Sequence, residues 1–287
     1  MDGILLGTVS GGRRARDRVA TAAIWLSVLV AAVPLAFVVG YLVQRGAGVV
    51  DWDFLTDDIP ISSRLPGPGM GPALLGTLVI TGAAAAMAIP LGVLAAVYLN
   101  EYGGKGRLAG VIRFLSDVMA GVPSIVMGLF VYTVWVLRYG QTGFAGSLAL
   151  ACLMLPIVIR SAETALQLVP TELREASAAL GARTSRTILT VVLPAALPGV
   201  VSGALLAVAR AAGETAPLLF TIGTVNAANP SLLDGTNTAL SAQIFGNARL
   251  PFDAAIDRAW GAALTLIVLV FVLTAIARVI TRRFTVR

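Results

Sequence analysis

Residues 170–199 read PTELREASAALGARTSRTILTVVLPAALPG, a long polar interval with apolar runs close on both sides. Its opening has the composition of a short helix, in which Thr171 is the expected N-cap. Glu172 and Glu175 follow, where carboxylates stabilise the positive end of the helix dipole. Gly181 lacks a Cβ atom and can adopt the left-handed conformation that ends such a helix. The pattern therefore predicts a short helix closed by a sharp turn.

A second helical piece is expected from about Thr184 to Leu193. Pro194 and Pro198 come next, and proline lacks the backbone N–H that a helix interior needs, so both are expected to reset the backbone. The two pieces together form a helix–Gly–helix elbow. Because long apolar runs flank this elbow, we expect it to lie at a membrane surface.

The composition of the chain excludes a soluble globular protein. Of the 287 residues, 57% are hydrophobic and 13% are charged, whereas soluble domains average about 25% charged residues. The mean hydropathy is +0.87. There is no histidine, which removes the usual general base and the usual metal ligand. Cys152 is the single cysteine, so no intramolecular disulfide can form.

Apolar runs long enough to span a hydrocarbon core of ~30 Å recur along the chain. We predict an all-α, polytopic membrane protein with six transmembrane helices, at about 20–43, 72–98, 115–137, 144–166, 196–222 and 258–280. The connections are an Asp- and Pro-rich outer loop, a basic loop over 99–114, a tight turn over 138–143, the elbow, and a polar connection over 223–257. The expected division is a tail over 1–19, a first helix and outer loop over 20–70, a core over 71–280 with the elbow at about 170–195, and a tail over 281–287.

Orientation follows from the distribution of lysine and arginine among the loops. One side of the membrane receives both termini, the 99–114 loop and the elbow, with Arg13, Arg14, Arg16, Arg18, Lys105, Arg107, Arg113, Arg174, Arg183, Arg186, Arg278, Arg282, Arg283 and Arg287. The other side has only Arg45, Arg64, Arg138, Arg249 and Arg258, among seven aspartates. Both termini and the elbow are therefore predicted to be cytoplasmic. The net charge of +6 is a topology signal and does not indicate nucleic-acid binding.

Arg160 and Glu163 fall inside the fourth predicted span, and Arg210 and Glu214 fall inside the fifth. A charge at the bilayer centre costs at least ~2.5–3.5 kcal/mol, so such residues usually face the protein interior or water. Spacings of three and four residues place the members of each couple on one helix face, where they can pair. At 1.5 Å per residue, Arg210 lies roughly 20 Å from the cytoplasmic start of its helix, near the membrane midplane.

These four residues allow two interpretations. In one, they form two internal salt bridges that fix helix packing. In the other, the arginines line a positively charged path for an anion, since guanidinium groups bind oxyanions in a fork geometry. The two can coexist, because the glutamates can hold the arginines in place while leaving donors free.

The elbow resembles the EAA loop of permease subunits of bacterial ABC importers. That family has Glu-Ala-Ala, then Gly, then Ile-x-Leu-Pro. In this chain the matching positions are Glu175, Ala176, Gly181, Leu193 and Pro194, while Ser177 and Val191 replace the second Ala and the Ile. The resemblance implies a type I ABC importer permease fold, in which the elbow couples to an ATPase subunit.

Further segments resemble PstA-type permeases of the phosphate-specific ABC importer. They are YLNEYGGKGRLAGVIRF (98–114), AGVPSIVMGLF (120–130), RAAGETAPLLFT (210–221) and ALSAQIFGNA (239–248), so the resemblance covers most of the chain from residue 71 on. It implies import of inorganic phosphate across the bacterial cytoplasmic membrane. By this likeness Arg160, Arg210 and Glu214 correspond to charged residues of the phosphate path, and Glu163 is included with them as the partner of Arg160.

The chain lacks a GxxxxGK[ST] phosphate loop, so we expect it to be a non-catalytic subunit that binds no cofactor of its own. The family resemblance implies a PstC-type permease partner, two ATPase subunits that bind Mg-ATP, and an extracytoplasmic phosphate-binding protein. The chain itself is expected to lie in the lipid bilayer. The alternatives are a permease for another oxyanion such as molybdate or sulfate, the PstC-type subunit itself, or a stand-alone anion channel or secondary transporter.

Overall fold

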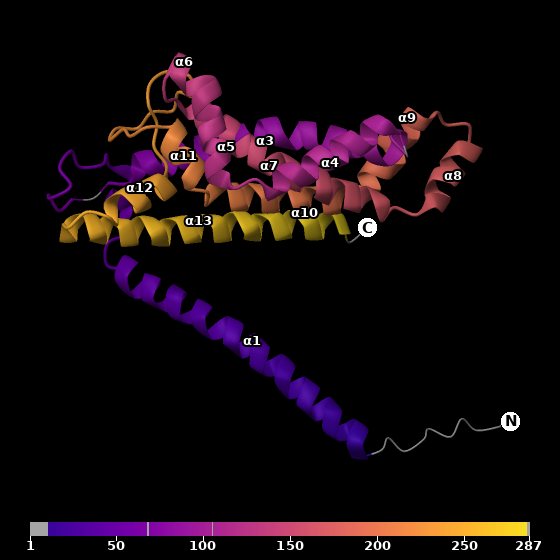
Figure 1. The fold of residues 1–287 in the computed structure, drawn as a ribbon, viewed down its shortest axis with the longest axis horizontal. Helices are drawn as coiled ribbons and strands as arrows, with labels where there is room; N and C mark the ends of the chain where they lie inside the picture. Colours follow the sequence, from indigo (N-terminus) through magenta and orange to yellow (C-terminus); the bar gives the residue numbers. More distant parts are fainter. Residues whose placement is uncertain (1–10, 68, 105, 286–287) are drawn as a thin grey trace.

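The computed structural model describes residues 11–67, 69–104 and 106–285, and regular structure in this part is all helical (Figure 1). The α-helices are α1 (Gly11–Gly46), α2 (Trp52–Thr56), α3 (Gly71–Val97), α4 (Arg107–Gly121), α5 (Ser124–Val131), α6 (Leu137–Tyr139), α7 (Gly143–Gln167), α8 (Thr171–Ala179), α9 (Thr184–Thr187), α10 (Leu193–Ala212), α11 (Ala216–Thr221), α12 (Leu240–Asn247) and α13 (Asp253–Thr285). Three π-helical segments continue neighbouring helices: η1 (Tyr98–Tyr102), η2 (Tyr132–Val136) and η3 (Ile188–Val192). Residues 1–10 and 286–287 of the predicted tails lie outside the described residues.

Within the described residues, five helices are long and apolar enough to cross a membrane, and a sixth span is reached when α4 and the helix that follows it are counted together. The helices predicted at 20–43, 72–98, 144–166 and 258–280 are confirmed, although α1 and α13 extend into the predicted tails. In Figure 1, α3, α7, α10 and α13 run alongside one another, whereas α1 diverges from them. α1 meets α13 near its C-terminal end, where the ring of Tyr41 packs edge-on against Trp260.

The centre of the bundle is the contact between α3 and α7, which alanine and glycine residues make close. Ala84 and Ala88 of α3 are buried against Met154 and Val158 of α7. A Cβ atom added at Gly92 would lie 2.6 Å from Cγ1 of Val158. In lipid, helix association depends on such close packing because the surrounding acyl chains are as apolar as the side chains.

The third predicted span is not a straight helix, so the prediction of one helix over 115–137 was wrong. α4 already begins at Arg107, inside the predicted basic loop, and the chain then bends by 105° between α4 and α5. The bend lies at Val122, whose backbone is extended, and Pro123. Proline disfavours the helical conformation of the residue before it, which accounts for the break.

The fifth predicted span also differs, because the chain is continuously helical from Thr184 to Ala212. Pro194 and Pro198 lie inside this helix, so the prediction that they reset the backbone was wrong. The π segment η3 directly precedes them, and local π adjustment is one way in which membrane helices accommodate proline. The helix breaks instead at 213–215, before α11.

The predicted polar connection over 223–257 contains structure of its own, since α12 lies within it and α13 begins before residue 258. The backbone N–H of Leu240 donates to Oγ1 of Thr77, and Oγ of Ser241 donates to the carbonyl of Glu214, both at 2.9 Å. Arg258 is buried and donates to the carbonyls of Ser63 and Leu65. The loop before α3 and the connection that contains α12 are therefore anchored to α3, to α13 and to the break in the fifth span.

We expect Gly92→Leu to destabilise the bundle, because a leucine there would overlap Val158. Overpacking of this kind costs about 1–3 kcal/mol. The midpoint of thermal unfolding in detergent should fall for this variant. Gly82→Leu on the same helix is the matched control, because no atom lies within 4 Å of a Cβ built there. Equal midpoints for the two variants would contradict the importance of the close α3–α7 contact.

Candidate functional site

The elbow is formed by α8, the turn at Gly181, and the helical stretch that begins with α9. Gly181 has φ +76°, as expected for a left-handed turn. The N–H of Ala182 donates to the carbonyl of Ser177 at 3.2 Å and the N–H of Gly181 donates to that of Ala178 at 2.9 Å. These two bonds form a Schellman motif, which satisfies the last carbonyls of α8. Thr171 is the first helical residue, and Pro170 holds the N-cap position, so the predicted cap was wrong.

Most of the elbow is exposed at one end of the molecule, at the far right of Figure 1. Glu175, Ala176 and Pro194 are exposed, whereas Leu193 is half-buried. Leu180 is 90% exposed at the turn. Of the five residues singled out from the sequence, Glu175, Ala176 and Gly181 are exposed on α8 and its turn, whereas Leu193 and Pro194 begin α10.

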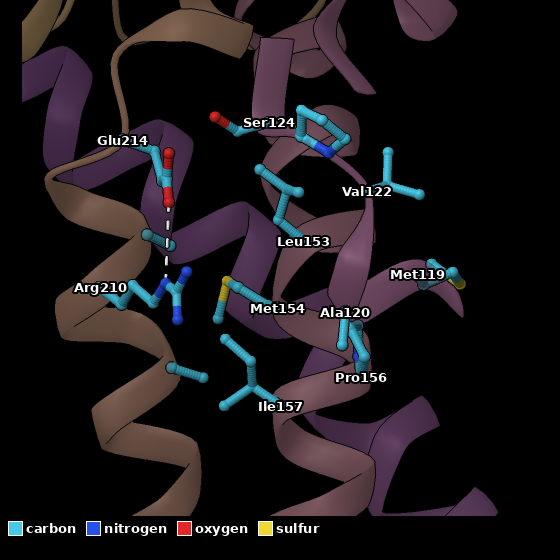
Figure 2. Close-up of a pocket in the computed structure, with 13 residues that line it drawn as sticks. Met119, Ala120, Val122, Ser124, Leu153, Met154, Pro156, Ile157, Arg210 and Glu214 are labelled. Carbon is cyan, nitrogen blue, oxygen red and sulfur yellow. Dashed lines mark ion pairs between the residues drawn. The ribbon is translucent and has the colours of Figure 1, made fainter. Parts of the chain in front are cut away.

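A cleft of ≈ 280 Å³ lies where α4, α7 and α10 approach one another (Figure 2). Met119 and Ala120 line it from the end of α4, and the break at Pro123 contributes part of its wall. Met154 of α7 lies opposite α10, whose last turn carries Arg210. The two helix breaks that the sequence did not predict therefore help to form this cleft.

Arg210 and Glu214 both line the cleft, and Nε of Arg210 lies 3.8 Å from Oε1 of Glu214. The predicted pairing of these two residues is thus confirmed, although Glu214 follows the end of α10 in the break before α11. The side chain of Arg210 is 70% exposed and that of Glu214 is 22% exposed. Within the described part of the chain, the guanidinium of Arg210 makes no hydrogen bond. Its N–H donors are therefore available to a ligand that enters the cleft.

Arg160 and Glu163 do not pair with each other as predicted, because each meets a residue of α4 instead. Nε of Arg113 lies 2.9 Å from Oε1 of Glu163, whose side chain is 5% exposed. Arg160 pairs with Asp117, one turn further along α4. In the first pair α4 supplies the basic residue, and in the second it supplies the acidic one. Two ion pairs of opposite polarity therefore hold α4 against α7. Arg113 and Asp117 were not assigned to the site from the sequence, although their spacing of four residues is the available signal.

A second groove, of ≈ 630 Å³, continues from the cleft between α7 and α10. The two share Ala120, Pro156 and Ile157. Arg160 lines the groove together with the hydroxyl residues Ser161, Thr164 and Ser202. Arg210 and Arg160 therefore lie along one connected hollow that runs toward the elbow, whereas Glu163 is buried behind its wall against Arg113.

Known proteins are similar to this chain over most of its length. The chain is 43% identical over 274 residues to "Phosphate transport system permease protein PstA 1" of Mycobacterium tuberculosis (strain CDC 1551 / Oshkosh), covering 93% of this chain and 89% of that protein. It is 39% identical over 269 residues to "Phosphate transport system permease protein PstA" of Yersinia pestis, covering 93% and 90%.

Among solved structures, a chain of a bacterial alginate ABC transporter in complex with an alginate pentasaccharide-bound periplasmic protein superposes with a TM-score of 0.65. The match covers 95% of this chain and 96% of that one at 15% identity, so it supports the fold alone. The family described as "Binding-protein-dependent transport system inner membrane component" matches residues 88–286. This chain therefore belongs to that family of multi-pass inner-membrane proteins, the non-catalytic permease subunits of ABC transporters.

Proposed function

We propose that this chain is the permease subunit of an ATP-driven importer of inorganic phosphate and forms half of its translocation path. The observation that carries the proposal is Arg210, an exposed guanidinium with free donors in a cleft between helices. Relatives at 39–43% identity that are named as phosphate transport permeases support the choice of anion. Glu214 keeps Arg210 in position at 3.8 Å, too far for a strong hydrogen bond.

The anion path runs from Arg210 to Arg160 along the hollow between α7 and α10. A phosphate that has lost part of its water shell needs charged donors, and guanidinium groups supply them in a planar fork. Arg160 is about half exposed and is partly neutralised by Asp117. Glu163 acts indirectly, because it fixes Arg113 and with it the position of α4. Carboxylates beside each arginine also weaken the hold on the anion, so that it can leave.

Coupling to ATP hydrolysis is assigned to the exposed elbow. Glu175 and Ala176 contribute to the surface that an ATPase subunit covers, while Gly181 fixes the turn. Leu193 and Pro194 begin α10, the helix that carries Arg210. Movement of the elbow therefore reaches the cleft through a single continuous helix.

The complete transporter contains a PstC-type permease, two ATPase subunits that bind Mg-ATP, and an extracytoplasmic phosphate-binding protein. Both termini and the elbow face the cytoplasm. Support comes from Figure 1, in which the start of α1, the end of α13 and the elbow lie toward the same end of the molecule. The permease core extends over 71–280, in keeping with a family match over 88–286.

Uptake by proteoliposomes that contain the complete transporter tests this function. Radiolabelled phosphate should accumulate only when ATP is present on the elbow side, and unlabelled molybdate or sulfate should compete weakly. Uptake without ATP would indicate a channel or a secondary transporter. Stronger competition by molybdate or sulfate would assign the chain to another oxyanion.

We expect Arg210→Gln to reduce phosphate uptake by roughly ten- to a hundredfold, the scale of a lost charge-assisted hydrogen bond. The double variant Arg210→Gln, Glu214→Gln should show the same loss, because packing is restored but the cationic donor is not. Uptake is measured at equal membrane abundance, with Arg278→Gln on α13 as the matched control. If the double variant recovers uptake, the pair is a structural bridge only.

We expect Gly181→Val to disturb the elbow, because φ +76° costs an L-residue about 1–2 kcal/mol. No atom lies within 4 Å of a Cβ built at Gly181, so the effect is one of backbone strain alone. ATP-driven uptake should fall while the amount of chain in the membrane stays unchanged. Gly181→Asn is the control, since asparagine tolerates the left-handed conformation. Equal uptake by both variants would show that the turn is not required.

Single cysteines in a Cys152→Ala background test the orientation. Ile61→Cys, at a position 94% exposed, should react with an impermeant thiol reagent added to intact cells. Arg107→Cys, exposed at the start of α4, should react only after the membrane is permeabilised. The opposite labelling pattern would reverse the topology.

A further inference from the structure

Arg174 of the elbow is bonded to two other parts of the molecule at once. Its Nη2 lies 2.9 Å from Oε1 of Glu101, and its Nε donates to Oε2 of the same carboxylate at 3.4 Å. Its Nη1 donates to the carbonyl of Val169 at 2.6 Å, and Nη2 also donates to that of Leu166 at 3.1 Å. Arg174 therefore joins α8 to the end of α7 and to Glu101 by a forked, charge-assisted contact.

Glu101 lies in η1, the π segment that prolongs α3, and its side chain is only 8% exposed. The amide of Asn100 donates to the same oxygen at 2.6 Å, so the carboxylate is held from two sides. Interrupting a helix with a π segment is uncommon, and such segments are frequent at functional sites. Here the π segment carries Glu101, which binds the elbow through Arg174.

Arg113 connects this region to the wall of the hollow. Its Nη2 donates to the carbonyl of Leu99 at 3.0 Å, and its Nε bonds to Glu163 of α7 at 2.9 Å. One turn further along α4, Asp117 pairs with Arg160 in the groove. Ion pairs thus join α8 to η1 and α4 to α7, and the hydrogen bond from Arg113 to the Leu99 carbonyl joins η1 to α4. α4 and α7 both line the cleft opposite α10.

We infer that Glu101 is a positioning residue that makes α8, the exposed first helix of the elbow, move as one body with α3, α4 and α7. This inference rests on the proposed function, because the movement matters only if an ATPase subunit drives the elbow. α8 is connected to α10 along the chain through the Gly181 turn, α9 and η3, a route that does not include the Arg174 contacts. Displacement of α8 then opens or closes the hollow between α7 and α10. Breaking the Glu101–Arg174 contact separates the movement of α8 from that of α7.

The first measurement is the amount of phosphate taken up per ATP hydrolysed by proteoliposomes with the complete transporter. Glu101→Gln should leave ATP hydrolysis near the wild-type rate. It should lower the amount of phosphate taken up per ATP about tenfold or more, because the carboxylate charge that binds the Arg174 guanidinium is lost. Asp253→Asn is the control, because it also removes one carboxylate charge, at an exposed position of α13 away from the elbow. Uptake and ATP hydrolysis that decline together, with an unchanged ratio, would mean that Glu101 only stabilises the fold.

The second measurement is independent of phosphate. Spin labels on Ala179→Cys and Gly110→Cys, both at exposed positions, report the distance between α8 and α4 in a Cys152→Ala background. The distribution of distances between the two labels should be narrow with and without nucleotide in the wild type and broad in Glu101→Gln. Arg174→Lys serves as a second variant, because an ammonium cannot bond the carboxylate as a fork and the α7 carbonyls together.

The two measurements separate the inference from the proposed function. The inference is overturned if the label-to-label distances stay narrowly distributed in Glu101→Gln or Arg174→Lys, whichever of them folds. This holds even if the wild type imports phosphate. A distribution that broadens only in the variants supports the inference even if the wild type imports a different anion.

Discussion

A carboxylate buried within a membrane protein needs a partner of opposite charge, and Glu163 finds it in Arg113 of α4. Removal of one partner from such a pair leaves an uncompensated charge and is strongly destabilising. The bond therefore fixes how α4 crosses α7, and the Asp117–Arg160 pair fixes the same crossing one turn away. α4, held in this way, ends before Pro123, where the chain bends by 105° into α5, and this bend contributes part of the wall of the cleft.

Against this background of paired charges, Arg210 differs from the arginines of the α4–α7 and elbow contacts. Arg113 and Arg174 each make short bonds to a carboxylate and to main-chain carbonyls. The nearest carboxylate to Arg210 is 3.8 Å away, and 70% of its side chain is exposed. Guanidinium N–H donors that are already hydrogen-bonded within the protein stabilise its fold, whereas donors left free in a hollow can bind an anion. The contrast in bonding, more than the presence of charge, distinguishes the binding residue from the structural ones.

The sequence was sufficient to predict features that depend on local pattern. Apolar runs located both ends of α3 and α7 closely, and found α1 and α13 but not their extensions beyond the apolar run. Gly181 was predicted to be left-handed because only glycine adopts that turn without strain. It was not sufficient for contacts between distant residues, such as Arg113 with Glu163, which are 50 positions apart. Spacing along one helix suggested that Arg160 pairs with Glu163, but it carries no information about α4. The breaks at Pro123 and Gly213 were missed because the same residue types also lie inside helices of this chain, as Pro198 and Gly203 do in α10.

Close packing also determines where α10 can move. A Cβ atom added at Gly199 would lie 2.7 Å from Cβ of Ala165, and one at Gly203 would overlap Ser161, so α10 touches α7 tightly in the half nearer the elbow. Toward Arg210 the packing continues on one side of α10, since Ala207 and Ala211 are buried with Met154 and Val158 of α7. On the other side Arg210 faces the cleft, and α10 then ends at Gly213. Any movement of α10 has to preserve these contacts, and the exposed side chain of Arg210 is the part of its last turn that packing constrains least.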